Sequence, residues 1–207
     1  MLTYDDLIAG LEDAWIAAGL HEHALIESVI PASHDRNVKV ELFPDHPEPL
    51  TEENMPPWVE LSFTWSALHQ LYSEGRDFAP EPLDLIWIYN VPVRGMIDRS
   101  DNELVRMFQR VVHAAFQRFY PAEAETMEPI AVEVRRIYQD DGQRLRSVYS
   151  HLVSTNLTDL SDQWANRDLH TLHNLMRTEA QLVSTIIHGL TELFAPNGRG
   201  YRSVDTA

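Results

Sequence analysis

The sequence predicts an α+β fold: a mainly antiparallel sheet packed by two helices, with an additional long C-terminal helix. Three observations lead to this prediction. Several segments of five to ten residues alternate between apolar and polar side chains, as half-buried strands do. Two other segments carry apolar residues three or four positions apart and begin with helix-capping residues. A third helical pattern runs from Leu160 to Phe194, just before the C-terminal tail.

The first predicted helix runs from Tyr4 to Ala18. Thr3 is placed to cap it, and Asp6 follows three residues later, which approximates a capping box. Gly19 is a natural C-terminal stop, because glycine readily adopts the left-handed conformation that ends many helices. The apolar face of this helix consists of Leu7, Leu11, Trp15 and Ala18.

Four strands are predicted next, interrupted by an acidic, proline-containing loop, Asp45–Pro57. Val59–Trp65 alternates strictly, which indicates a strand with one buried face. Leu83–Val91 is apolar at almost every position after Asp84, so we expect a central strand covered on both faces and the most buried segment of the chain. The two earlier strands are Ala24–Ile30 and Val38–Phe43.

The second predicted helix begins at Ser100, whose side chain forms a full capping box with Glu103, and it ends before Pro121. Its apolar stripe consists of Leu104, Phe108, Val111, Ala115 and Phe119. Two strands follow, Ile130–Tyr138 and Leu145–Val153, and Asp140-Asp141-Gly142 between them has the composition of a hairpin turn.

The C-terminal helix is predicted over Leu160–Phe194, with a second cap at Asp168. Its apolar residues fall on heptad positions: Leu169, Leu172, Met176, Val183, Ile186, Leu190 and Leu193. This pattern is compatible with packing on the chain's own domain and with packing on a partner. We take these seven residues as the candidate oligomer or partner interface. The predicted organisation is an α+β core domain at 1–157, a helical extension at 158–194 and a flexible tail at 195–207.

Composition narrows the functional classes. The 207 residues include no Cys, so disulfides, thiolate metal sites and a Cys nucleophile are excluded. The formal net charge of -16 disfavours direct binding to nucleic acid, because an acidic surface repels phosphates. No apolar run approaches the roughly 18 residues that span a membrane, so no membrane contact is expected.

Candidate chemical residues are few. His21 and His23 would share a face of a strand and, with His34 and His46 nearby, form the best metal candidate; the alternative is that they are polar residues flanking a helix end and loops. His170 and His173 are one helical turn apart, but the intervening residues do not form a zinc-protease motif. Nucleophile elbows, phosphate loops and dinucleotide fingerprints are also missing from the sequence. We therefore predict a protein that is not an enzyme, with no catalytic, cofactor-binding or metal-binding residue and no cofactor.

A small basic patch is also predicted on the hairpin. Arg135-Arg136 and Arg144-Arg146 are expected to face each other across it. They would form salt bridges with the many acids or contact an acidic partner surface.

The order of elements resembles the tail terminator (tail-completion, or head–tail joining) proteins of long-tailed bacteriophages. The residues that carry the likeness are the helix Tyr4–Ala18, the strands Val59–Trp65 and Leu83–Val91, the capped helix Ser100–Tyr120 and the hairpin Ile130–Val153. The likeness covers about the first 155 residues. The loop Asp45–Pro57 and the terminal helix depart from the family pattern, and a head–tail connector suits the same features.

This resemblance implies a structural protein of the virion, assembled in the host cytoplasm. It would form a homo-oligomeric ring, typically hexameric, that contacts the tail tube and the connector. Two alternatives stay open: a small-ligand-binding protein or metal-using enzyme built around His21 and His23, and a cellular adaptor that acts through its C-terminal helix. If that helix is an assembly element, a chain cut before Asp159 should keep its fold and lose its assembly.

Overall fold

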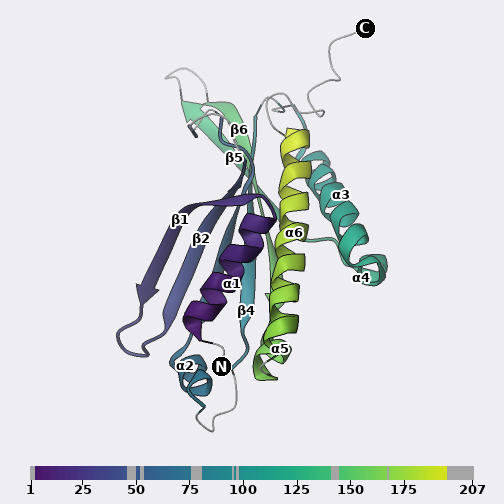
Figure 1. Ribbon diagram of the computed structural model, residues 1–207. Coiled ribbons are helices and arrows are strands. Elements are labelled where there is room, and N and C mark those ends of the chain that lie inside the picture. Colours follow the sequence, from purple (N-terminus) through teal and green to yellow (C-terminus); the bar gives the residue numbers. More distant parts are fainter. Residues whose placement is uncertain are drawn as a thin grey trace. The chain divides into compact units, whose positions relative to one another are not determined.

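The computed structural model describes residues 3–45, 50, 51, 54–75, 81–94, 96, 98–140, 145–166 and 168–194, and for residues 139, 140 and 145–149 it describes the backbone. These residues form an antiparallel sheet of six strands in the order β1-β2-β3-β4-β6-β5, together with six helices (Figure 1). The predicted α+β class, with its antiparallel sheet and long C-terminal helix, is confirmed.

Most elements lie where they were predicted, although β1 begins earlier and β6 ends later, and two short helices are added. The strands are β1 (Leu20–Val29), β2 (Arg36–Pro44), β3 (Trp58–Trp65), β4 (Asp84–Val93), β5 (Val132–Asp140) and β6 (Leu145–Asp159). The three helices expected from the sequence are α1 (Tyr4–Ala17), α3 (Asp101–Phe119) and α6 (Leu169–Phe194). The short helices α2 (Ala67–Ser73) and α4 (Pro121–Thr126) were not predicted, and α5 (Ser161–Ala165) is the first part of the predicted helix Leu160–Phe194, before its second cap at Asp168.

The chain forms two compact units that do not follow the predicted order along the sequence. Unit 1 consists of Met1–Asp45, Glu60–Ile88 and Asn156–Gln181, and unit 2 of His46–Val59, Tyr89–Thr155 and Leu182–Ala207. Helix α6 therefore contributes its first half to unit 1 and its second half to unit 2. This differs from the predicted helical extension at 158–194, because both halves of the helix are packed into the units. The predicted tail, 195–207, lies outside the described residues.

Unit 1 is organised around α1, which begins as predicted. The Thr3 hydroxyl accepts a hydrogen bond from the Asp6 amide at 3.2 Å, and the Asp6 carboxylate accepts one from the Thr3 amide at 2.9 Å. Gly19, just beyond the helix, has a φ of 73°, the left-handed conformation expected of a C-terminal stop. The buried face of α1 consists of Tyr4, Leu7, Leu11, Ala14 and Trp15.

Strand β4 lies inside the sheet, and from Asp84 to Asn90 one of its faces is buried and the other half-buried. Leu85 and Trp87 are fully buried, whereas Ile86 and Ile88, which point to the opposite face, are half-buried. The expectation that this strand is covered on both faces was therefore wrong for this part, and it holds at the end of the strand, where Val91, Pro92 and Val93 are all buried. Up to Asn90 the burial alternates as in β3, although β3 alternates in sequence and β4 does not.

In unit 2, α3 packs its apolar stripe against β4. The Phe108 ring meets the Tyr89 ring edge to face, with 6.3 Å between centroids. The buried residues of the helix are Leu104, Phe108, Val112 and Ala115, so Val112 takes the place predicted for Val111. The predicted hairpin is confirmed as the antiparallel pair β5–β6, which extends to Asp159. Most of its predicted turn, from Asp141 on, lies outside the described residues.

The capping role of Ser100 at the start of α3 can be tested directly by mutation. Ser100 accepts a hydrogen bond from the Glu103 amide, and Glu103 accepts one from the Ser100 amide at 2.9 Å. The hydrogen bonds that the Ser100 amide and hydroxyl donate to the Glu103 carboxylate hold the pKa of that carboxyl below its ordinary value. We expect Ser100→Ala to lower the free energy of unfolding by about 1 kcal/mol, the usual effect of losing an N-cap. Urea denaturation measures this. An unchanged midpoint would contradict the capping role, and the neighbouring Asn102→Ala is the control.

Candidate interaction site

The seven heptad residues of α6 do not form an exposed apolar surface. Leu172, Met176, Val183, Ile186 and Leu190 are fully buried within the single chain, and Leu169 and Leu193 are half-buried. The assignment of the first five to a partner interface is therefore corrected: they belong to the chain's own core. The predicted second cap at Asp168 is present, because its carboxylate accepts a hydrogen bond from the Thr171 amide at 3.1 Å.

Two glycines show how closely α6 packs within each unit. In unit 1, a Cβ atom on Gly10 of α1 would lie 2.7 Å from Cε of Met176. In unit 2, a Cβ atom on Gly189 would lie 2.7 Å from Cγ1 of Val111 on α3. Both separations are shorter than a van der Waals contact, so α1 and α3 approach α6 only because these positions lack a side chain (Figure 1).

The histidines proposed as metal ligands are not brought together. His21 Nε2 lies 2.6 Å from Asp45 Oδ1, while the His23 ring packs edge to face on Phe43. A β-bulge between Glu22 and Ala24 interrupts the alternation that would have placed the two imidazoles on one face. His34 lies in the following turn with a φ of 61°, and His46 lies outside the described residues. Within the described ranges, no three His, Asp or Glu residues converge in a way that could hold a metal ion.

His170 and His173 of α6 each lie against another residue of the chain. His170 Nε2 lies 3.1 Å from the Asn174 side-chain nitrogen, one turn further along α6. His173 lies against Gly10 of α1, where a Cβ would come within 3.0 Å of its ring. They are therefore not paired with each other on this helix.

Several exposed apolar residues of unit 1 lie on β1, which is an edge strand. The sheet order places β1 at one end, hydrogen-bonded to β2 alone among the described strands. Leu25 is 42% exposed, Ile26 is 55% exposed and Val29 is 57% exposed. Leu25 pairs with Val40, whose side chain is buried, whereas Ile26 pairs with Lys39, so the exposed apolar residues occupy both faces of the strand.

One contact joins this edge strand to α1, and a second joins α1 to the neighbouring strand β2. The Tyr4 hydroxyl of α1 donates a hydrogen bond to the Glu27 carboxylate of β1, and the Arg36 guanidinium lies 4.7 Å from the centroid of the Tyr4 ring. Burial raises the pKa of Tyr4, and the hydrogen bond to Glu27 raises it further, so the phenol remains a donor. The edge of the sheet is therefore formed before any partner arrives.

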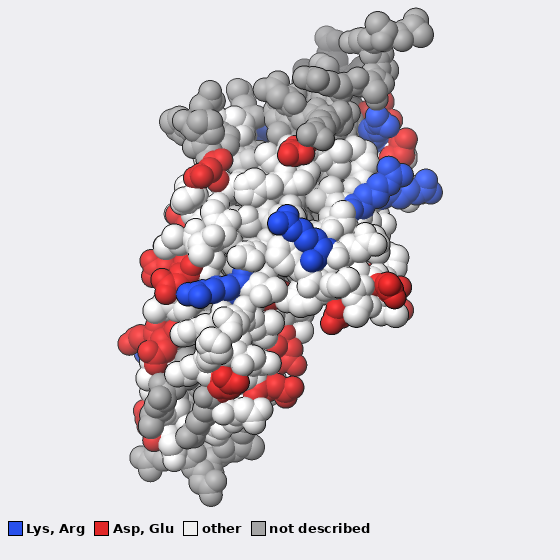
Figure 2. All heavy atoms as spheres, turned by 45° about the vertical axis from the view of Figure 1, so that its right-hand side comes forward, with Lys and Arg blue, Asp and Glu red and all other residues white. Residues whose placement is uncertain are grey.

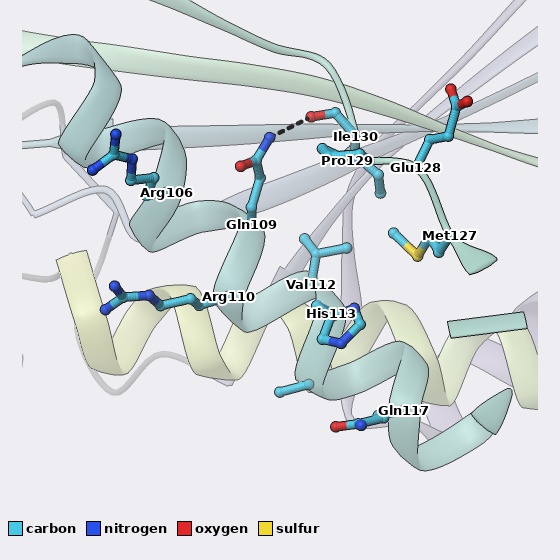
Figure 3. A pocket seen from close by; sticks show the side chains of 11 residues that line it. Arg106, Gln109, Arg110, Val112, His113, Gln117, Met127, Glu128, Pro129 and Ile130 are labelled. Atoms are coloured by element: carbon cyan, nitrogen blue, oxygen red, sulfur yellow. Dashed lines mark hydrogen bonds between the residues drawn. The ribbon is translucent and has the colours of Figure 1, made fainter. Parts of the chain in front are cut away.

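Unit 2 carries a groove between α3 and the segment that leads to β5. Its volume is about 380 Å³, which is within the range of binding pockets (Figure 3). The Gln109 side-chain amide donates a hydrogen bond to the Ile130 carbonyl at 3.2 Å and joins the two walls. Apolar lining comes from Val112, Ala114, Met127, Pro129 and Ile130.

The cationic end of this groove is formed by Arg106 and Arg110, one helical turn apart. Figure 3 shows both side chains extending to the same end, away from Val112 and Met127. Both residues are exposed, and neither forms an ion pair with any residue that the structure describes. On the face drawn in Figure 2, the basic side chains lie mainly across the middle, and acidic side chains lie above and below them.

The basic patch predicted on the hairpin is not formed as expected. Arg135 pairs with Glu133 at 2.7 Å, and Arg136 pairs with Asp101 at 2.7 Å. In the hairpin register, Arg135 lies opposite His151 and Arg146 opposite Gln139, so Arg146 does not face Arg135 or Arg136. Arg144 lies outside the described residues. The arginines of α3 were missed from the sequence, because nothing nearby in the chain marks them as part of a groove.

Comparison with protein-family models, with curated proteins and with solved structures finds no match to this chain. In the described part of the chain, every helix is too short or too polar to cross a membrane.

Proposed function

We propose that this chain is a structural or assembly protein that acts by contact with other protein subunits. Its most specific form is the one that the sequence resemblance implies: a tail terminator or head–tail connector component that forms a ring at the head–tail junction of a tailed virus. The observation that carries the proposal is the exposed, apolar edge strand β1.

An open edge strand is a template for pairing with another chain, because its outward N–H and C=O groups have no strand partner. Proteins that stay monomeric commonly protect such edges with charges or prolines. β1 carries the exposed acids Glu22 and Glu27, but its second half also presents Leu25, Ile26 and Val29 to solvent. These features support a contact in which a strand of a neighbouring subunit adds to β1 and its side chains cover the apolar positions.

The proposal predicts a fixed oligomer that depends on β1. Light scattering and native mass spectrometry should give the wild-type chain a mass several times that of one protomer. The double variant Ile26→Lys/Val29→Lys should shift the protein to monomer, because a partner strand would then bury two unpaired ammonium groups.

The matched control is Leu157→Lys. Leu157 is 56% exposed, as much as the β1 residues, but it lies near the end of β6. The control should assemble like the wild type, and circular dichroism should show all three proteins folded. A wild-type chain that is monomeric at every concentration measured would contradict the ring. A double variant that assembles normally would remove β1 from the contact.

A further inference from the structure

We infer that the α3 groove of one copy binds the outer face of helix α1 of a second copy. This inference rests on the proposed function and adds a contact to it. The groove is defined as the surface formed by Arg106, Arg110 and the apolar lining residues described above. It belongs to unit 2, and α1 belongs to unit 1.

The groove has the chemistry of a site for an acidic, partly apolar segment. Its two guanidiniums are exposed and have no ion-pair partner among the described residues. The neighbouring lining is apolar, and its one carboxylate, Glu128, belongs to the opposite wall. An occupant that places carboxylates at the arginine end and an aliphatic side chain beyond it would satisfy both parts.

The outer face of α1 provides such a segment. Asp5, Glu12 and Asp13 are exposed, and none of them forms an ion pair with a described residue. Ile16, which follows on the same face, is 57% exposed and is among the most exposed large apolar residues described. Ile16 lies four residues after Glu12 and three after Asp13, about one helical turn from each, so carboxylates and an aliphatic group are presented side by side.

Charge complementarity favours a second copy of the chain as the occupant of the groove. A chain with a net charge of -16 repels itself, and a contact that brings opposite charges together offsets this repulsion. Few surfaces offer this, because only 16 of the residues are Lys or Arg and several of them are paired internally. The unpaired arginines of the groove and the unpaired acids of α1 complement each other.

The contact joins two different surfaces of the same chain. Such a heterologous contact passes from copy to copy and closes into a ring when the rotation permits. The inference therefore accounts for a ring without a self-complementary patch.

A charge exchange tests the contact in the full-length chain. Arg106→Glu/Arg110→Glu and Glu12→Arg/Asp13→Arg should each weaken self-association at least about tenfold in sedimentation or light scattering, because like charges then meet across the contact. An equimolar mixture of the two variants should form mixed contacts, because the reversed groove of one variant complements the reversed α1 of the other. The chain that carries all four substitutions should regain association.

Arg118→Glu is the matched control: it reverses an exposed charge on the same helix outside the groove lining and should leave association unchanged. Circular dichroism confirms that each variant is folded. If the wild type assembles and the groove variants assemble equally well, or if the four-substitution chain associates no better than its parents, the inference is overturned. If Ile26→Lys/Val29→Lys dissociates the oligomer while the groove variants do not, the proposed function stands and the groove contact fails. A wild type that never associates overturns both.

Discussion

A chain truncated after Thr158 is expected not to fold. The truncation removes α5 and α6, whose residues supply buried side chains to both units. The largest of those lost are Trp164, Met176, Ile186, Ile187, Leu190 and Phe194, each at most 1% exposed. The sequence left open whether the helix packs on its own chain or on a partner, and this expectation reverses the one drawn for the second case, in which a chain cut before Asp159 keeps its fold.

The magnitude follows from hydrophobic burial. Fully burying one large apolar side chain contributes about 1.5–3 kcal/mol, and a whole domain is stable by only about 5–15 kcal/mol. Losing six or more such side chains, and exposing the residues they covered, exceeds that margin. Circular dichroism and heat denaturation of the truncated chain should show no cooperative transition. A truncated chain that unfolds cooperatively would show that the helix is dispensable. Truncation after Phe194, which removes no described residue, is the control.

Trp87→Ala should lower the free energy of unfolding by about 3–5 kcal/mol. Trp87 is 1% exposed, and its indole N–H donates a hydrogen bond to the Thr158 hydroxyl at 3.0 Å. That hydroxyl in turn donates to the buried Glu179 carboxylate at 2.8 Å, so the indole begins a chain of buried polar contacts that reaches α6. Alanine would leave a cavity and remove the donor at the same time.

Two further variants separate these effects in denaturant unfolding. Trp87→Phe keeps most of the volume and loses the hydrogen bond, so it should cost about 1–3 kcal/mol. Ile86→Ala, on the half-buried face of the same strand, should cost less than Trp87→Ala. Equal losses for Ile86→Ala and Trp87→Ala would mean that both faces of β4 are covered.

Local signals in the sequence predicted the local structure well. Thr3 with Asp6 and Ser100 with Glu103 are capping boxes in the structure, because such caps need only a few neighbouring residues. The alternation of Val59–Trp65 likewise corresponds to β3, since burial of one face requires that period.

Features that depend on contacts between residues far apart in the sequence were not predictable from local signals. A heptad pattern is the same whether a helix packs on its own chain or on a partner, so it did not reveal that Met176 meets Gly10. The groove combines Arg106 and Arg110 with Met127–Ile130, which are joined only by the folding of the chain. The bulge that separates His21 from His23 has no glycine or proline to mark it.

Helix α6 also sets the order of events during synthesis. It is the last described element, yet Leu169–Gln181 belongs to unit 1 and Leu182–Phe194 to unit 2. Neither unit can complete its core on the ribosome until these residues have left the exit tunnel. At about 5–20 residues per second, the surface of α1 around Gly10 waits about 8–33 seconds for Met176, and the surface of α3 around Val111 waits about 4–16 seconds for Gly189. Both units are therefore expected to complete their cores only after α6 has emerged, and a chaperone that shields apolar segments would act in that interval.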